Sequence, residues 1–289
     1  MRKFFTRHPM LPILIPAVLL LYFVYISLGW NVWVSVSDWQ NGSLSASYGW
    51  GGFGQYAKMF SSEYFGTSLI NTLLLFCLIP ICLLLGLGLA LLMDQGLRGT
   101  TLFRNLILLP FALSFVVTGT VWAWMYRPTN GVLNSFLQII GINTANLMWT
   151  SSNDTVMLSI IIALVWQFSG YVAVIFLAGI KSVPENVINA AKLDGAYSLR
   201  IYWKLIIPRL KGAMGSCITI LAMYALRSFD FIVSLVGYTK SAAWTLPVWM
   251  YQEAFSKNNF ALAAAISCFL LALVLVLILP LTYWTNKRK

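Results

Sequence analysis

The chain reads Ser182-Val-Pro-Glu-Asn-Val-Ile-Asn-Ala-Ala-Lys-Leu-Asp-Gly-Ala196 and, a little further on, Ile206-Ile-Pro-Arg-Leu210. This polar and basic stretch interrupts a sequence in which 60% of the residues are hydrophobic and 9% are charged. Soluble domains carry nearer ~25% charged residues, so the composition indicates an integral membrane protein. The stretch is too long for a tight turn and too patterned for a slack linker. We expect it to be a folded piece on one side of a membrane.

Apolar runs on both sides of this stretch indicate the architecture. Each run is near the ~20 residues that a helix needs to cross a bilayer. Six such runs cover about residues 11–33, 68–93, 103–125, 156–180, 213–236 and 261–285. The sequence therefore predicts an all-α membrane protein with six transmembrane helices.

The basic residues indicate which way these helices cross. Fourteen of the 19 lie on one side of the predicted spans, four lie on the other, and Arg227 lies within a span. Cytoplasmic loops carry the excess of lysine and arginine, so both termini and the loop 181–212 are predicted to be cytoplasmic. Because the basic residues are spread over several loops, the net charge of +11 does not indicate a nucleic-acid partner.

Two parts follow from this topology. Residues 1–66 are expected to hold the N-terminal transmembrane helix and an extracytoplasmic loop. Residues 67–287 are expected to form a transmembrane core that carries the cytoplasmic loop 181–212. The two halves of the chain do not match in loop lengths or motifs, so an internal repeat is not predicted.

The first half of the cytoplasmic loop has the signals of a short helix. Ser182 and Glu185 have the spacing of a capping box, in which the serine oxygen accepts the Glu185 backbone N–H. A helix is predicted over residues 186–193. Gly195 is expected to end it, because glycine readily adopts the left-handed conformation of a helix C-terminus.

The second half of the loop predicts another short helix. Ser198 can cap it, and it is expected to stop near Ile207 because Pro208 disfavours helix in the residue before it. The loop would then be a helix–turn–helix along the inner face of the membrane. From the residues alone, two interpretations are equally good. The segment is either a well-capped surface helix or an element that transmits movement from a docked partner to the membrane helices.

The loop also resembles a known motif. Asn189-Ala-Ala-x-x-Asp-Gly-Ala196, followed by Ile206-Ile-Pro208-x-Leu210, is similar to the signature loop of permease subunits of binding-protein-dependent ABC importers. That family usually has glutamate where this chain has Asn189, and often a second proline where it has Lys211. Arg104-x-x-x-x-x-Pro110 and Ser228-Phe-Asp230 resemble the maltose/oligosaccharide and glycerol-phosphate permease group in particular.

The resemblance implies a type I ABC importer permease fold and a function. The chain would be the permease subunit of an ATP-driven carbohydrate importer in the cell membrane of a bacterium or archaeon, forming half of the translocation pathway. Its partners would be a second permease, two cytosolic ATPase subunits, an extracytoplasmic solute-binding protein and membrane lipid. The positions that match the family's ATPase-coupling motif are Asn189, Ala190, Ala191, Asp194, Gly195, Ala196 and Pro208.

The sequence lacks the signals of an enzyme or of a cofactor site. It has no Gly-x-x-x-x-Gly-Lys-[Ser/Thr] phosphate loop, so ATP is expected to be used by the partner ATPase and no cofactor by this chain. Its eight acidic residues are scattered and its one histidine, His8, lies in the basic tail. We therefore predict neither catalytic nor metal-binding residues, and a membrane-embedded enzyme is a weaker alternative.

Some side chains within the predicted spans are candidates for a substrate path. Charged residues inside a membrane are functional candidates by default, and Arg227 and Asp230 also have the i,i+3 spacing of an ion pair. The alternative is that the two residues pair with each other, or with the partner permease, for structure alone. Aromatic rings and amides suit the mixed surfaces of sugars, although aromatics within spans more often pack against other helices. The candidates are Trp166, Gln167, Tyr171, Tyr224, Arg227 and Asp230.

Two further alternatives concern the transported substance and the energy source. A polyol or a glycerol phosphate is the competitor to a sugar, although a phosphate calls for basic residues in the path and Arg227 alone is thin support. An autonomous secondary transporter would need buried charges on several spans and repeated halves, which the sequence lacks.

Overall fold

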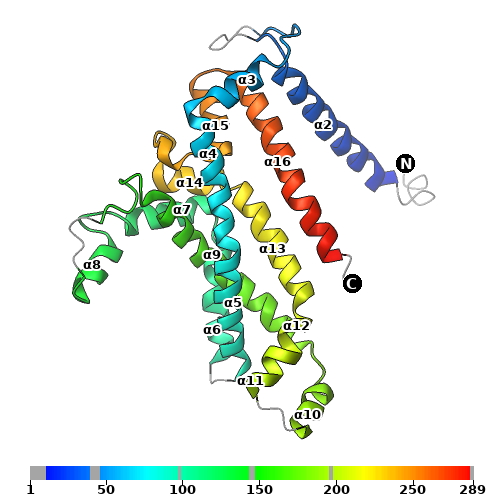
Figure 1. Cartoon of the computed structure of the whole chain (residues 1–289), viewed down its shortest axis with the longest axis vertical. Coiled ribbons are helices and arrows are strands. Elements are labelled where there is room, and N and C mark those ends of the chain that lie inside the picture. The colour runs from blue at the N-terminus through cyan, green and yellow to red at the C-terminus, as the bar shows by residue number, and fades with distance from the viewer. Residues whose placement is uncertain (1–10, 40–45, 97–98, 143–146, 195–197, 287–289) are drawn as a thin grey trace. The chain divides into compact units, whose positions relative to one another are not determined.

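The computed structural model describes residues 11–39, 46–96, 99–142, 147–194 and 198–286 (Figure 1). Over these residues the chain forms helices and loops, with one isolated antiparallel bridge between Ser37 and Trp50. The elements in chain order are α2 (Leu11–Ser35), α3 (Gly54–Ser61), α4 (Glu63–Leu74), η1 (Leu75–Cys77), α5 (Leu78–Asp94), α6 (Thr100–Ala112), α7 (Phe115–Met125), α8 (Val132–Ile139), α9 (Val156–Lys181), α10 (Glu185–Leu193), α11 (Ser198–Ile201), η2 (Tyr202–Ile206), α12 (Ile207–Arg209), α13 (Lys211–Leu226), α14 (Phe229–Val236), η3 (Ser241–Ala243), α15 (Leu246–Tyr251), η4 (Gln252–Ser256) and α16 (Phe260–Asn286).

Several of these helices are long and apolar enough to cross a membrane. Four do so as continuous segments: Pro16–Ser35, Glu63–Asp94, Val156–Lys181 and Phe260–Pro280. Two further pairs qualify together but are bent, by 99° between α6 and α7 and by 55° between Tyr202–Arg209 and α13. Counting each pair as one span gives six, with the fifth over 202–226 where we predicted 213–236, and the all-α membrane fold is confirmed.

The third and fifth predicted spans are not continuous helices; we expected at most a kink at Pro110 in the third. The run 103–125 breaks after α6, where Leu113 is extended. Pro110 lies one turn before this break, and a proline inside a helix removes a backbone hydrogen bond and clashes with the preceding turn. The run 213–236 breaks at Arg227 and Ser228, between α13 and α14. The apolar composition is the same whether a span is straight or broken, so it does not distinguish the two.

The chain divides into two compact units. The first holds Met1–Phe65 and Trp249–Leu271, and the second holds Gly66–Val248 and Ala272–Lys289. The predicted boundary between residues 66 and 67, with one continuous core after it, stays a prediction.

Glycines bring the helices of the second unit into close contact. A methyl group added at Gly86 of α5 would lie 2.5 Å from Cγ1 of Val172 on α9. One added at Gly170 of α9 would lie 1.8 Å from the carbonyl oxygen of Ile107 on α6. Small residues at helix interfaces let backbones approach in this way. The glycines therefore place α9 between α5 and α6, and α9 carries part of the site described below.

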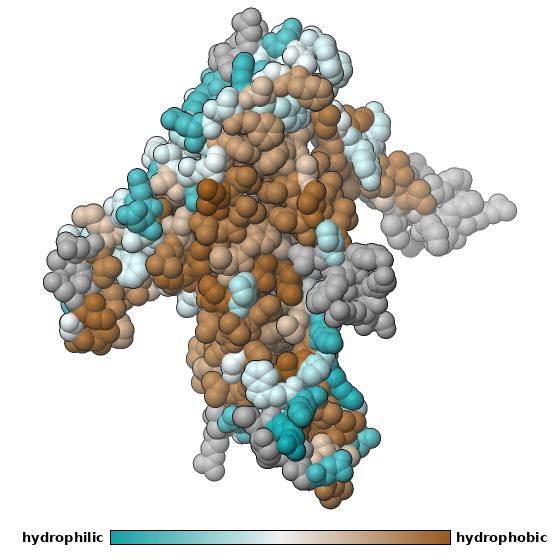
Figure 2. Space-filling view, in the orientation of Figure 1, coloured by the Kyte–Doolittle hydropathy of each residue, from teal (hydrophilic) through white to brown (hydrophobic). Residues whose placement is uncertain are grey.

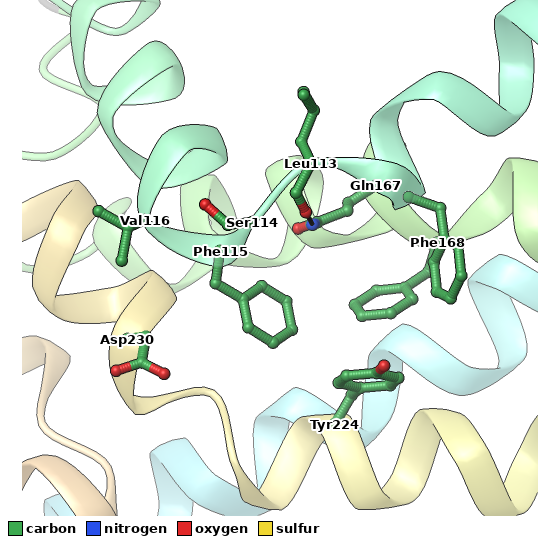
Figure 3. A pocket seen from close by; sticks show the side chains of 9 residues that line it. Leu113, Ser114, Phe115, Val116, Gln167, Phe168, Tyr224 and Asp230 are labelled. Atoms are coloured by element: carbon green, nitrogen blue, oxygen red, sulfur yellow. Dashed lines mark hydrogen bonds between the residues drawn. The ribbon is translucent and has the colours of Figure 1, made fainter.

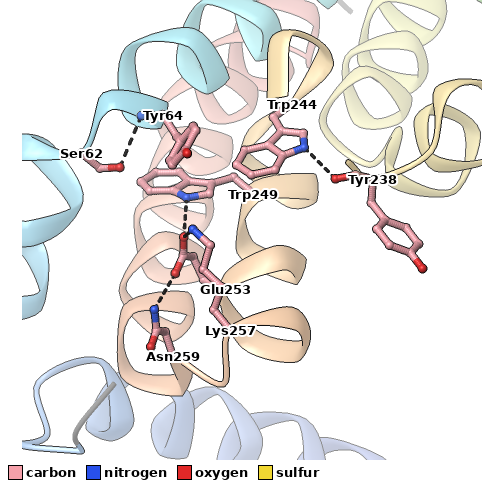
Figure 4. Close-up of polar contacts among 8 residues, drawn as sticks. All are labelled: Ser62, Tyr64, Tyr238, Trp244, Trp249, Glu253, Lys257 and Asn259. Atoms are coloured by element: carbon pink, nitrogen blue, oxygen red, sulfur yellow. Dashed lines mark hydrogen bonds and ion pairs between the residues drawn. The ribbon is translucent and has the colours of Figure 1, made fainter. Parts of the chain in front are cut away.

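The first unit contains a buried carboxylate with a full set of donors (Figure 4). Glu253 is 3% exposed and accepts hydrogen bonds from the Trp249 indole at 3.1 Å, the Lys257 amine at 2.7 Å and the Asn259 amide at 2.8 Å. The Lys257 amine also lies 5.0 Å from the centre of the Tyr64 ring. A buried charge is tolerated when it is paired and hydrogen-bonded, so this network fixes the turn that leads from η4 into α16.

Candidate functional site

Two helix breaks meet in the second unit. At the first, the Ser114 hydroxyl caps α7 by accepting the backbone N–H of Val117 at 3.3 Å. At the second, Asp230 lies in the first turn of α14, where a carboxylate is favoured by the helix dipole. Gly119 of α7 faces Ser234 and Phe231 of α14, so the two outer helix pieces pack closely. Both spans therefore change direction at one place.

A cavity of about 360 Å³ lies at these breaks (Figure 3). Its volume falls within the ~300–1,000 Å³ typical of small-molecule sites. Rings make up much of its wall, with polar tips among them. It is lined by Phe111, Leu113, Ser114, Phe115, Val116, Gln167, Phe168, Tyr224 and Asp230.

Gln167 is the most informative side chain in this wall. It is 2% exposed, and its amide nitrogen donates to the carbonyl of Leu113 at 3.2 Å, at the first helix break. Its side-chain oxygen is buried and has no hydrogen-bond partner. A buried acceptor without a partner is costly, and such groups are typical of sites that a ligand or water completes. Gln167 thus both braces the break and offers an acceptor.

Aromatic rings give the cavity its apolar surface. Phe168 and Tyr224 have ring centres 4.8 Å apart, and Phe115 meets Tyr224 edge-on at 5.5 Å. Phe111 stacks on Tyr171 at 4.4 Å with an angle of 19° between the planes. Figure 3 shows the Phe115 and Tyr224 rings directed into the space between the two breaks. Such rings offer flat apolar faces with a hydroxyl at one edge.

The structure brings together some of the predicted path residues and separates others. Gln167, Tyr224 and Asp230 line the cavity, and Tyr171 lies behind Phe111. Trp166 instead packs edge-on against the indole of Trp122, away from the lining. These positions do not assign a role to any of the residues.

The predicted ion pair between Arg227 and Asp230 is wrong. Among the described residues the one salt bridge is that of Lys257 with Glu253. Arg227 follows the C-terminus of α13 and Asp230 opens α14, so the i,i+3 geometry of one continuous helix does not exist there. Each charge instead stands at the helix end that its sign favours.

The sequence arguments missed the residues at the first break: Phe111, Ser114 and Phe115. A signal was present, because Pro110 is followed within one turn by serine, a preferred N-cap residue. That pattern indicates an end and a restart of helix within one span.

The cytoplasmic loop forms the expected first helix with a different start. Helix α10 covers Glu185–Leu193, close to the predicted 186–193. The predicted capping box is not formed: Ser182 has the helical backbone conformation of the α9 C-cap, and its hydroxyl donates to the carbonyl of Gly179 at 2.7 Å. Ser182 thus belongs to the end of α9, and α10 begins directly after Pro184.

The second helix of the loop does not stop at Ile207. Helical residues continue through Pro208 to Arg209, by way of the π-helical turn η2. The wider turn changes the register of the backbone hydrogen bonds, and Pro208 then stands in the first turn of α12, where its missing N–H has no partner to lose. The prediction that Pro208 stops the helix near Ile207 is therefore wrong.

Most of the predicted coupling residues that the structure describes are accessible. Asn189, Ala190, Asp194 and Pro208 are exposed and Ala191 is half-buried. Gly195 and Ala196 lie outside the described residues. Leu193, at the end of α10, is 90% exposed. Figure 2 shows hydrophilic side chains gathered at this end of the second unit, below the apolar surface of α5 and α6.

One hydrogen bond ties the second half of the loop to a membrane span. The Tyr202 hydroxyl in η2 donates to a carboxylate oxygen of Asp94, the last residue of α5, at 2.6 Å. Hydrogen bonds to a charged acceptor are among the stronger ones in proteins. The loop is thus fastened to the bundle by a specific polar contact.

Broken helices that line a cavity at membrane depth define a class of protein. Non-helical backbone is tolerated within a bilayer only where it is buried in protein or lines a polar space, as in membrane transporters. The family model described as "Binding-protein-dependent transport system inner membrane component" matches residues 82–284. The chain belongs to this family of ABC importer permeases, which are multi-pass transport proteins and not enzymes.

Comparisons with individual proteins agree with this assignment. The chain is 43% identical to a probable ABC transporter permease of Pyrococcus horikoshii over 97% of this chain and 98% of the relative. It is 37% identical to the xylose/arabinose import permease of Haloferax volcanii over 95% of this chain and 86% of the relative. A chain in a crystal structure of a bacterial alginate ABC transporter has the same fold, with a TM-score of 0.79 at 21% identity over 99% of this chain and 95% of that one.

Proposed function

We propose that this chain is one of two permease subunits of an ATP-driven carbohydrate importer and forms half of its translocation pathway. Both termini and the loop 181–212 would face the cytoplasm, in the plasma membrane of a bacterium or archaeon. The importer would contain two ATPase subunits, one of which would dock on the loop, and an extracytoplasmic binding protein would deliver the substrate. ATP would be used by the ATPase alone.

The observation that carries the carbohydrate proposal is the cavity at the two helix breaks. Sugars present apolar C–H faces and hydroxyl edges, which the rings of Phe115 and Tyr224 and the unpaired oxygen of Gln167 complement. The xylose/arabinose permease among the relatives supports this substrate class.

The charge of the cavity disfavours a phosphorylated substrate. Among its lining residues the one carboxylate is Asp230, and no lysine or arginine lines it. Phosphate groups are bound by basic side chains and repelled by carboxylates. A glycerol phosphate is therefore the weaker alternative, although one relative is described as a glycerol-3-phosphate permease.

The substrate class can be tested on the assembled importer. The tagged chain would be purified from its native membranes together with the proteins that accompany it, and reconstituted in vesicles. We expect an ATPase and a second permease to co-purify, and neutral sugars with the binding protein to stimulate ATP hydrolysis. Stimulation by glycerol 3-phosphate but by no neutral sugar would overturn the substrate proposal. A chain that transports without an ATPase would overturn the subunit proposal.

The Asp94–Tyr202 hydrogen bond offers a test of the coupling role of the loop. Tyr202→Phe removes the bond and keeps the ring, at a cost of about 1.5–3 kcal/mol for a bond to a charged group. We expect the number of ATP molecules hydrolysed per solute imported to rise several-fold, because the loop would pass less of the ATPase movement to α5. Trp203→Phe is the matched control, since Trp203 is the exposed neighbour. If the number of ATP molecules hydrolysed per imported solute is unchanged in the Tyr202 variant, this hydrogen bond does not contribute to coupling.

A further inference from the structure

Helix α8 (Val132–Ile139) carries an apolar face that no described part of the chain covers. It follows α7 and precedes α9 in the chain, and it projects from the rest of the second unit (Figure 1). Val132, Phe136 and Ile139 follow one another at helical spacing, and Ile140 comes directly after the helix. All four are exposed, and Ile139 is 83% exposed. In Figure 2 the free end of α8 is correspondingly hydrophobic.

The opposite face of α8 is fixed to the protein by Asn134. Its amide nitrogen donates to the carbonyls of Pro128 at 3.1 Å and Leu147 at 3.4 Å, and its oxygen accepts the Trp149 indole N–H at 2.7 Å. Asn134 is 2% exposed. The helix is therefore held in one rotation about its axis, with its apolar face turned outward.

The base of α8 is continuous with the end of a membrane span. Trp149, which holds Asn134, has its ring 5.4 Å from that of Tyr126, directly after α7. Tyr126 in turn lies 5.1 Å from Trp122 of α7. Tyr126 and Trp122 are buried, but Trp124 in the last turn of α7 is 52% exposed. Exposed tryptophan gathers at the level of the lipid headgroups, so this end of α7 places the start of α8 near the membrane–water boundary.

The composition of the region favours lipid over a protein partner. No charged residue occurs between Arg127 and Asp154, so α8 lacks arginine, one of the residues enriched in protein interfaces. A binding protein that docks and leaves would expose this face to water in each cycle, and contiguous apolar patches in water are an aggregation liability. Lipid covers the face at all times.

We propose that α8 lies in the membrane interface, with Val132, Phe136, Ile139 and Ile140 inserted among the acyl chains and headgroups. Interfacial helices bury an apolar face by about 5–10 Å in this way. The helix then anchors the outer end of α7 to the bilayer surface. Since α7 packs on α14 beside the cavity, the anchor steadies one wall of the site.

The test compares two adjacent positions whose side chains project about 100° apart from α8: Ile139 on the apolar face and Gln138 outside it. An environment-sensitive fluorophore would be attached to Ile139→Cys or to Gln138→Cys, in a transport-competent background whose native cysteines are replaced by alanine. Both side chains are exposed, so neither label disturbs a packed core. The importer would be reconstituted in phosphatidylcholine vesicles with or without nitroxide-labelled lipid, and with or without its binding protein.

We expect nitroxide lipid to quench the label at position 139 several-fold more than the label at 138, and iodide in the water to do the reverse. This pattern should not change when the binding protein is added. Quenching of the 139 label by iodide would overturn the proposal. So would resistance of the 139 label to both quenchers, which would indicate a protein partner, or loss of lipid quenching when the binding protein docks.

Discussion

A Gly170→Ala variant is expected to melt well below the wild-type temperature and to yield less folded protein on extraction. The added methyl group would lie 1.8 Å from the carbonyl oxygen of Ile107, which is backbone and cannot rotate away. Helices α6 and α9 would have to separate, and overpacking typically costs about 1–3 kcal/mol, with a contact to rigid backbone at the upper end of that range. Because proteins are stable by only ~5–15 kcal/mol, such a loss is a large fraction of the total. The measurements are the amount of monodisperse protein after detergent extraction and its melting temperature.

Gly88→Ala is the matched control for this prediction. Gly88 lies in α5, another span of the same unit, and nothing stands within 4 Å of a methyl group placed there. Alanine favours helix over glycine by up to ~1 kcal/mol, so this variant should melt at or slightly above the wild-type temperature. Equal melting temperatures for the Gly170 and Gly88 variants would show that the close approach of α6 and α9 does not limit stability.

The sequence was sufficient for the number and position of the spans because these depend on composition alone. A bilayer demands about 20 apolar residues for each crossing, and that demand leaves a signal that needs no knowledge of neighbouring helices. The loop with Asn189 and Pro208 was equally visible, since a polar segment stands out in an apolar chain. Helix α10 formed where the sequence predicted a helix.

The helix breaks could not be predicted in the same way. A bend of 99° between α6 and α7 depends on where those pieces pack, and apolar residues give both pieces the same composition. Pro110 indicates a kink and Ser114 indicates a restart of helix, but neither residue gives the direction in which the chain continues. For the same reason Arg227 and Asp230 appeared as a pair on one helix face, when the chain in fact breaks between them.

The composition of the cavity was partly predictable from the chemistry of its residues. Gln167, Tyr224 and Asp230 were candidates because polar groups are costly inside a membrane. Phe111 and Phe115 could not be recognised as lining residues from the sequence, since phenylalanine is common in apolar spans. Only the geometry of the breaks distinguishes these rings from packing residues such as Trp166.

Gln167→Leu is expected to lower carbohydrate uptake by roughly 10- to 100-fold while the importer still assembles and hydrolyses ATP in the absence of solute. Leucine has a similar size and removes the buried acceptor that we propose bonds a substrate hydroxyl. A hydrogen bond lost in a buried site costs about 1–3 kcal/mol, which corresponds to this range. The measurement is the initial rate of uptake in vesicles with saturating binding protein. This prediction rests on the proposed substrate cavity.

Two control variants separate substrate contact from bracing of the helix break. Trp166→Phe alters the adjacent residue, whose ring packs on Trp122 outside the cavity, and should leave uptake unchanged. Ser114→Ala removes the cap of α7 without touching the Gln167 oxygen, so it reports the effect of a weakened break alone. If Ser114→Ala lowers uptake as much as Gln167→Leu, the glutamine acts through its bond to Leu113. If Gln167→Leu leaves uptake intact, the Gln167 oxygen does not bond the substrate, and the proposed role of this acceptor is overturned.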